Sequence, residues 1–201
     1  NSIGIPLPDM DYKIVKIGTN KEIGVMKDGE ICISGPTVMK GYYNRPDLTE
    51  KAINSEGWLD TGDLAIMTIH NELQIKGRIK DTIVLRGGEN LEPLPIEMKL
   101  EESRFIKKAV VLGQDKRYLA ALILVSEDDV KSYAEENGIQ YDTYENLLQS
   151  EVIQKLYETE ISNLINSKTG FKMFERINKF TLITKDFEVG IEAYEEIDKW
   201  L

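Results

Sequence analysis

The sequence has only one cysteine and one histidine among its 201 residues. Because Cys32 stands alone, no disulfide can form within the chain, and we expect a reducing, cytoplasmic compartment. Cys32 alternates with Ile31 and Ile33, as a small core residue of a strand would. His70 has no Cys, His or acidic partner at metal-ligand spacing, so the sequence predicts no metal site.

Positive charge and long apolar runs are also scarce. Lys and Arg number 25 against 35 Asp and Glu, which gives a formal net charge of −10. No basic run is long enough to neutralise a phosphate backbone, so we expect no nucleic-acid partner. No apolar run approaches the ~18 residues of a spanning helix, and the first residues lack the pattern of a signal peptide. We expect no transmembrane segment, while peripheral membrane contact stays open.

The hydrophobic pattern changes near residue 79. Before it, alternating apolar residues predict short antiparallel strands, with one short helix at 45–53. After it, apolar runs predict buried strands, and three- and four-residue spacing over 143–166 predicts a long amphipathic helix. The predicted strands are 12–17, 30–34, 72–76, 108–113, 118–125 and 180–184. The predicted fold is therefore α+β, a β-rich part followed by a short sheet packed by helices.

Two stretches carry residue types suited to ligand binding. In residues 57–64, Asp63 follows Thr61 and Gly62 at a predicted tight turn, where a missing Cβ lets a ligand approach closely. A carboxylate there can accept two hydrogen bonds from the vicinal diol of a ribose, although spacing alone favours a turn-stabilising Asp. In residues 77–90, closely spaced charges and a Gly-Gly-Glu-Asn turn predict a hairpin.

Together with the Gly-Glu strand and glycine-punctuated loop at 29–46, these stretches resemble the later motifs of the adenylate-forming superfamily. That superfamily includes acyl-CoA synthetases, luciferases and peptide-synthetase adenylation domains. The three stretches are similar to its Gly-Glu-x-x-x-x-Gly, Trp-x-x-Thr-Gly-Asp and Gly-Arg-x-Lys-Asp segments, in the same order. The sequence at 79–97 is most similar to long-chain fatty acyl-CoA synthetases. The likeness is strong up to about residue 125 and looser beyond it.

The resemblance implies an acid–thiol ligase that forms an acyl-adenylate from a long-chain fatty acid and then a thioester. Its small-molecule partners would be ATP with Mg²⁺, the fatty acid and CoA. By position, Asp63 and Arg78 match residues that contact the nucleotide ribose. Gly87, Gly88 and Glu89 match the loop that lines the pantetheine tunnel of CoA, and Lys80 matches the hinge of the mobile domain.

The resemblance also implies two domains. Residues 1–79 would be the β-rich end of a large AMP-binding domain, a distorted antiparallel barrel, and 80–201 a mobile lid. The family's phosphate loop and Mg²⁺-binding glutamate do not occur, and its C-terminal lysine motif is not matched, because the flanks of Lys199 differ. We therefore assign no catalytic residue. We expect the C-terminal part of a longer enzyme, inactive alone, whose partner is the missing N-terminal domain of the same protein.

The sequence is also compatible with two other functions. One is an adenylation enzyme that loads an acyl-carrier protein in place of CoA. The other is a non-catalytic binding or assembly module that keeps the fold without the chemistry. The residues that would line an acyl tunnel are absent from these motifs, so the acyl chain length stays open as well.

Overall fold

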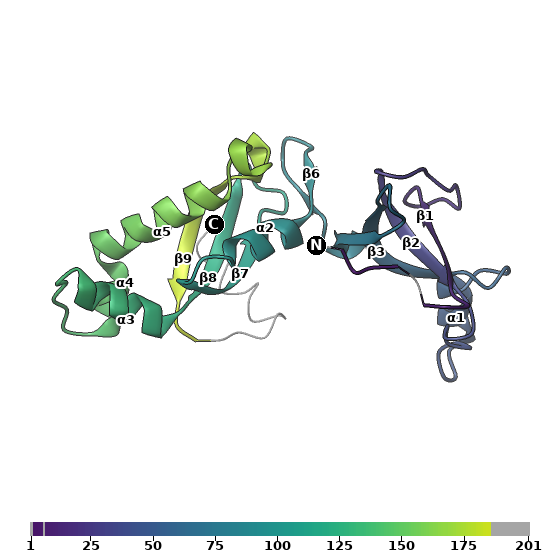
Figure 1. The fold of residues 1–201 in the computed structure, drawn as a ribbon, viewed down its shortest axis with the longest axis horizontal. Helices are drawn as coiled ribbons and strands as arrows, with labels where there is room; N and C mark the ends of the chain where they lie inside the picture. Colours follow the sequence, from purple (N-terminus) through teal and green to yellow (C-terminus); the bar gives the residue numbers. More distant parts are fainter. Residues whose placement is uncertain (1, 6, 186–201) are drawn as a thin grey trace. The chain divides into compact units, whose positions relative to one another are not determined.

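The computed structural model describes residues 2–5 and 7–185. The chain divides between Thr82 and Ile83 into two compact units, Asn1–Thr82 and Ile83–Leu201 (Figure 1). The C-terminal stretch from residue 186, which contains Lys199, lies outside the described residues. Among those described, no helix is long and apolar enough to cross a membrane.

The first unit is built on a four-stranded antiparallel sheet. Its strands are β1 Asp11–Val15, β2 Asp28–Ser34, β3 Leu59–Met67 and β4 Leu73–Arg78, in the order β1-β2-β3-β4. The predicted antiparallel sheet is confirmed, and it is open, with β1 and β4 at its edges, so it does not close into a barrel within the described residues. One face buries a small core of Ile14, Ile31, Ala65 and Leu73.

Two short helices complete the first unit. Helix α1, Pro46–Ala52, begins with proline at its first position, where a missing N–H costs no helical hydrogen bond. The single-turn 3-10 helix η1, Ile79–Asp81, follows β4 and ends just before the division between the units.

The second unit contains a three-stranded sheet with helices packed against it. Strands β7 Ile106–Leu112 and β8 Leu119–Val125 form an antiparallel hairpin, and β9 Ile177–Ile183 pairs with β8 in parallel. A small hairpin of β5 Ile83–Val84 and β6 Asn90–Leu91 precedes them. The helices are α2 Pro93–Leu100, α3 Glu127–Glu136, α4 Tyr144–Gln149 and α5 Glu151–Leu164, with 3-10 turns η2 Ser167–Thr169 and η3 Met173–Glu175.

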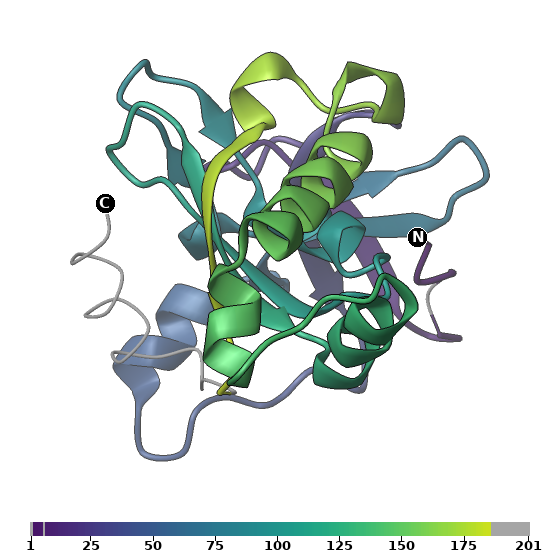
Figure 2. The ribbon, with the colours of Figure 1, turned by 90° about the vertical axis from the view of Figure 1, so that its left-hand side faces the viewer.

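The core of this unit lies between the sheet and the helices. Alternate residues of β8 point into it, while α5 runs along the sheet (Figures 1 and 2). Tyr157 on α5 is fully buried, and its hydroxyl donates a hydrogen bond to the carbonyl oxygen of Phe105 at 2.8 Å. This bond satisfies the one polar atom of a large core side chain. The α+β class predicted from the sequence is confirmed.

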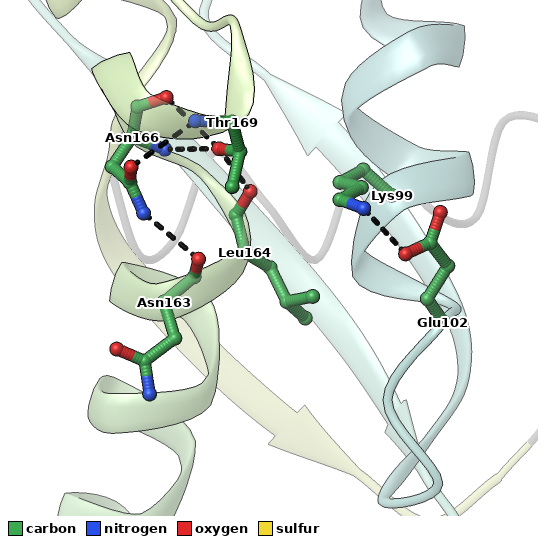
Figure 3. Close-up of polar contacts among 6 residues, drawn as sticks. All are labelled: Lys99, Glu102, Asn163, Leu164, Asn166 and Thr169. Atoms are coloured by element: carbon green, nitrogen blue, oxygen red, sulfur yellow. Dashed lines mark hydrogen bonds and ion pairs between the residues drawn. The ribbon is translucent and has the colours of Figure 1, made fainter.

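The long helix expected over 143–166 is divided in two at Ser150, so that prediction is wrong there. Ser150 has an extended backbone, with ψ of 144°, and its hydroxyl oxygen accepts a hydrogen bond from the amide of Ile153. Serine is a favourable N-cap, and this contact starts α5 afresh while the apolar spacing continues through the break. At the other end of α5, Asn166 and Thr169 bond to each other, and Thr169 Oγ1 bonds the carbonyl oxygen of Leu164 (Figure 3).

Candidate functional site

Asp63 lies in a wide bulge of β3 and not in a turn between strands. In the β2–β3 register, Glu30 lies opposite Leu64 and Cys32 opposite Asp60, so three residues of β3 face Ile31 alone. Two extra residues are thus accommodated in β3, and Gly62 adopts a left-handed φ of 73° to allow it. The predicted tight turn is therefore a bulge within a strand. The space beside Gly62 is open, since an added Cβ would meet nothing within 4 Å among the described residues, so the glycine is required here by its left-handed φ.

Hydrogen bonds from β2 hold this bulge, which we define as residues 61–63. The hydroxyl of Thr61 donates to the carbonyl oxygen of Ile31 at 2.8 Å, and the same oxygen of Thr61 accepts from the amide of Asp63 at 3.1 Å. The amide of Gly62 donates to the carboxylate of Glu30 at 3.3 Å. Two backbone amides of the bulge, those of Gly62 and Asp63, therefore have side-chain partners.

Asp63 is paired with Arg78, which lies directly opposite it on β4. Arg78 Nε is 3.0 Å from Asp63 Oδ1, and the two side chains are 68% and 30% exposed. This contact joins one carboxylate oxygen and one guanidinium nitrogen, and more than half of the arginine side chain is exposed. A carboxylate has a second oxygen and a guanidinium has two further nitrogens, so a pair of this kind suits a ligand with hydroxyl and anionic groups. The structure thus brings together the two residues that the sequence assigned to the nucleotide.

The neighbouring side chains are polar but tightly packed. Cys32 is buried, as predicted for a core residue, and its thiol donates to Asp60 Oδ1 at 3.2 Å. Burial, followed by that hydrogen bond, raises the pKa of Cys32 to about 12. Burial also raises the pKa of Glu30, and the charge of Asp60 adds to the effect. Lys13 Nζ of β1 lies 4.1 Å from the ring centroid of Trp58, which directly precedes β3, in a cation–π contact.

The loop of Gly87, Gly88 and Glu89 connects β5 to β6, which confirms the predicted hairpin. The amide of Leu85 donates to the carbonyl oxygen of Glu89 at 2.9 Å, and the amide of Gly88 donates to that of Leu85 at 2.8 Å. Gly88 has a φ of 90°, a conformation that favours glycine. The loop is therefore a compact turn with an exposed tip.

The turn between β7 and β8 contacts this loop, and no motif in the sequence indicated the contact. The side chain of Gln114 accepts from the amide of Val84 at 3.0 Å, and the amide of Asp115 donates to the carbonyl oxygen of Val84 at 2.9 Å. The amide of Arg86 donates to the carbonyl oxygen of Lys116 at 2.8 Å. The β7–β8 turn thus extends the small hairpin by backbone pairing between segments about 30 residues apart.

Lys80 is the middle residue of η1, two residues before the end of the first unit. Lys80 therefore lies close to the division between the units, and the hinge assignment stays a prediction. Among residues 2–5 and 7–185, no three His, Cys, Asp or Glu side chains gather to hold a metal ion.

Two family models match the chain. The model of the AMP-binding enzyme C-terminal domain matches residues 80–188, and that of the AMP-binding enzyme matches residues 1–43.

The individual proteins that are similar to this chain include fatty-acid ligases. The chain is 37% identical to a long-chain-fatty-acid–[acyl-carrier-protein] ligase of Arabidopsis thaliana, with 77% of this chain and 22% of the relative covered. It is 30% identical to long-chain-fatty-acid–CoA ligase 6 of Homo sapiens, with 93% and 27% covered. The chain thus spans about a quarter of the length of these relatives. A solved structure of O-succinylbenzoate coenzyme A synthetase from Bacillus subtilis, in complex with AMP, aligns at a TM-score of 0.64 and 25% identity, covering 92% of this chain and 32% of that one.

Proposed function

Because this chain belongs to the AMP-binding enzyme family, we propose that it is the C-terminal part of a ligase that joins a long-chain fatty acid to CoA. The ligase would consume ATP with Mg²⁺ and pass through an acyl-adenylate. The observation that carries the proposal is the Asp63–Arg78 pair, held at 3.0 Å on neighbouring strands and reachable from solvent. The single cysteine supports a cytoplasmic location.

In the adenylating step, the role we propose for this pair is to position the nucleotide. The carboxylate of Asp63 would accept hydrogen bonds from the two ribose hydroxyls, and Arg78 would hold that carboxylate and add a positive charge beside the nucleotide. Such contacts act by fixing the reacting phosphate relative to the attacking carboxylate, which can account for a large share of an enzyme's rate. Mg²⁺ would supply charge neutralisation at the phosphates when bound.

In the thioester-forming step, the loop of Gly87, Gly88 and Glu89 would line the passage for the pantetheine arm of CoA. Two small residues leave space beside the backbone for a narrow, extended ligand. We propose 1–79 as the end of the large domain, 80–201 as the lid, and Lys80 as the hinge between them. A lid that reorients would let one site exclude water while two nucleophiles attack in turn.

A second candidate differs only in the acceptor. The Arabidopsis thaliana relative named above is a ligase for an acyl-carrier protein, and its 37% identity to this chain lies within the 27–43% range of the CoA ligases. The acyl acceptor could therefore be the phosphopantetheine arm of a carrier protein, which presents the same thiol chemistry. Both candidates share the adenylating half-reaction.

The isolated 201-residue chain is expected to be catalytically silent. Asp63 and Arg78 alone would keep two or three hydrogen bonds to a nucleotide, each worth roughly 0.5–1.5 kcal/mol, or up to ~3 when charged. Against an association cost of at least ~4 kcal/mol, this predicts AMP binding of about millimolar affinity or weaker. Calorimetry that found micromolar AMP binding by the chain would contradict this expectation.

The test of the function uses the full-length protein. ATP–pyrophosphate exchange is measured with a panel of fatty acids, and thioester formation is then measured with CoA or with a carrier protein as acceptor. The expected result is exchange that depends on a long-chain acid, lost or weakened in Asp63→Ala. Asp47→Ala, an exposed carboxylate on α1 of the same unit, is the matched control. No exchange with any acid would refute the proposal.

A further inference from the structure

We propose that Glu30 is a positioning residue that holds the bulge of residues 61–63 in the shape that presents Asp63 to the nucleotide. Glu30 does not touch the nucleotide in this proposal, and acts through the backbone of Gly62. The inference rests on the proposed function, since it assigns a supporting residue to the same nucleotide site.

Two consecutive residues of β2, Glu30 and Ile31, form hydrogen bonds to the bulge. Glu30 accepts from the amide of Gly62 at 3.3 Å, and the carbonyl oxygen of Ile31 accepts from the hydroxyl of Thr61 at 2.8 Å. Gly62 has a left-handed φ, so without a partner its peptide could rotate among several conformations. The carboxylate of Glu30 therefore fixes the residue directly before Asp63.

Glu30 itself is placed by close packing of the strand. A Cβ on Gly29 would lie 2.4 Å from the carbonyl oxygen of Val15, a distance that real side chains do not reach. The glycine thus allows β2 to approach β1 closely, and the next residue, half-buried Glu30, then lies alongside the bulge. The contact between Glu30 and Gly62 therefore depends on the path of the β2 backbone as well as on the Glu30 side chain.

Glu30 is unfavourable for stability in its ionised form. Its pKa is raised by burial and by the charge of Asp60, so the folded state binds the proton more tightly than the unfolded chain. For a carboxyl group with this sign of shift, folding stability falls as the pH rises above its usual pKa. At neutral pH the charge of Glu30 therefore lowers stability, although the hydrogen bond from the Gly62 amide opposes part of this effect.

The experiment compares Glu30→Ala with Glu30→Gln in the full-length protein. Glutamine keeps an oxygen that can accept from Gly62 and removes the repulsion with Asp60, so it should retain the KM for ATP in pyrophosphate exchange, with an equal or higher melting temperature. Alanine removes the acceptor and should raise that KM between about threefold and tenfold, the range expected for one lost hydrogen bond. The kcat should change less than the KM, because Asp63 and the reacting groups are all still present and only the acceptor for the Gly62 amide is lost.

Asp28→Ala, which removes an exposed carboxylate two residues earlier on β2, is the matched control and should leave the KM unchanged. Asp63→Ala separates this inference from the function on which it rests. If Asp63→Ala raises the KM and Glu30→Ala does not, Glu30 is no positioning residue while the nucleotide site stands. If Glu30→Ala and Glu30→Gln lower the melting temperature and raise the KM equally, the role is structural and the inference is overturned. If Asp63→Ala has no effect, the nucleotide site itself is wrongly placed.

Discussion

The Asp63–Arg78 pair should contribute much more to nucleotide binding than to folding. Arg78→Ala removes the 3.0 Å contact, but the arginine is 68% exposed and the aspartate 30%, so solvent screens their attraction. Exposed pairs of this kind contribute roughly 0.2–1 kcal/mol to the free energy of unfolding. For a unit of about 80 residues, that lowers the melting temperature by at most about 4–8 °C.

The effect on the nucleotide should be larger. A charged hydrogen bond to a ligand is worth roughly 1.5–3 kcal/mol, so losing one weakens binding by about 10- to 150-fold. Because Arg78 also orients Asp63, the losses from Arg78→Ala and Asp63→Ala should not add in the double variant. The assay is a double-mutant cycle on the KM for ATP in pyrophosphate exchange by the full-length protein, run in parallel with thermal unfolding of the 201-residue chain.

Arg45 and Asp47 provide a matched control, since they form an ion pair of 2.8 Å in the same unit with both side chains 55% exposed. Their cycle should give the same small coupling in unfolding and none in KM. A coupling above about 2 kcal/mol in the unfolding of the Asp63–Arg78 cycle, with an unchanged KM, would show that this pair is structural and that our argument is wrong.

Three further predictions concern other parts of the chain. In the full-length protein, Lys80→Pro should impair adenylation and thioester formation unequally, because proline fixes φ near about −65°; equal losses in the two separate assays would argue against a hinge. Gln114→Ala should raise the KM for CoA a few-fold while leaving pyrophosphate exchange unchanged, because the amide of Val84 loses its partner beside the loop; a change in exchange alone would disprove this. Tyr157→Phe should cost about 0.5–1.5 kcal/mol in chemical denaturation, since it removes only the bond to Phe105; a loss above about 3 kcal/mol would refute it.

Elements with a strong local pattern could be predicted from the sequence. Alternation over residues 30–34 predicted β2, and the buried run over 118–125 predicted β8 to within one residue. The Gly-Gly-Glu-Asn hairpin was also found, because its turn chemistry is local. Asp63 and Arg78 were predicted as a functional pair by resemblance, and the structure adds that they lie opposite each other on neighbouring strands.

Features that depend on distant partners could not be predicted. The motif around Gly62 looks like a turn in sequence, and only the register with β2 reveals that it is a bulge inside β3. The break at Ser150 leaves the apolar spacing undisturbed, so the spacing alone predicts one continuous helix where the structure has two. The contact of Gln114 with Val84 joins segments about 30 residues apart, and neither segment has a local pattern that predicts the contact.

The parallel pairing of β8 with β9 has a consequence for biosynthesis. Leu119 lies opposite Ile177, so the growing polypeptide must lengthen by about 58 residues before β8 can gain its second neighbour. At translation rates of about 5–20 residues per second, this takes roughly 3–12 s. During that interval the apolar strand Leu119–Val125 has one unpaired edge, which is the kind of segment that associates with other nascent chains. Helix α5 is synthesised before β9 but would cover only one face of β8 and not its open edge. Chaperone binding would therefore matter most before β9 has been synthesised.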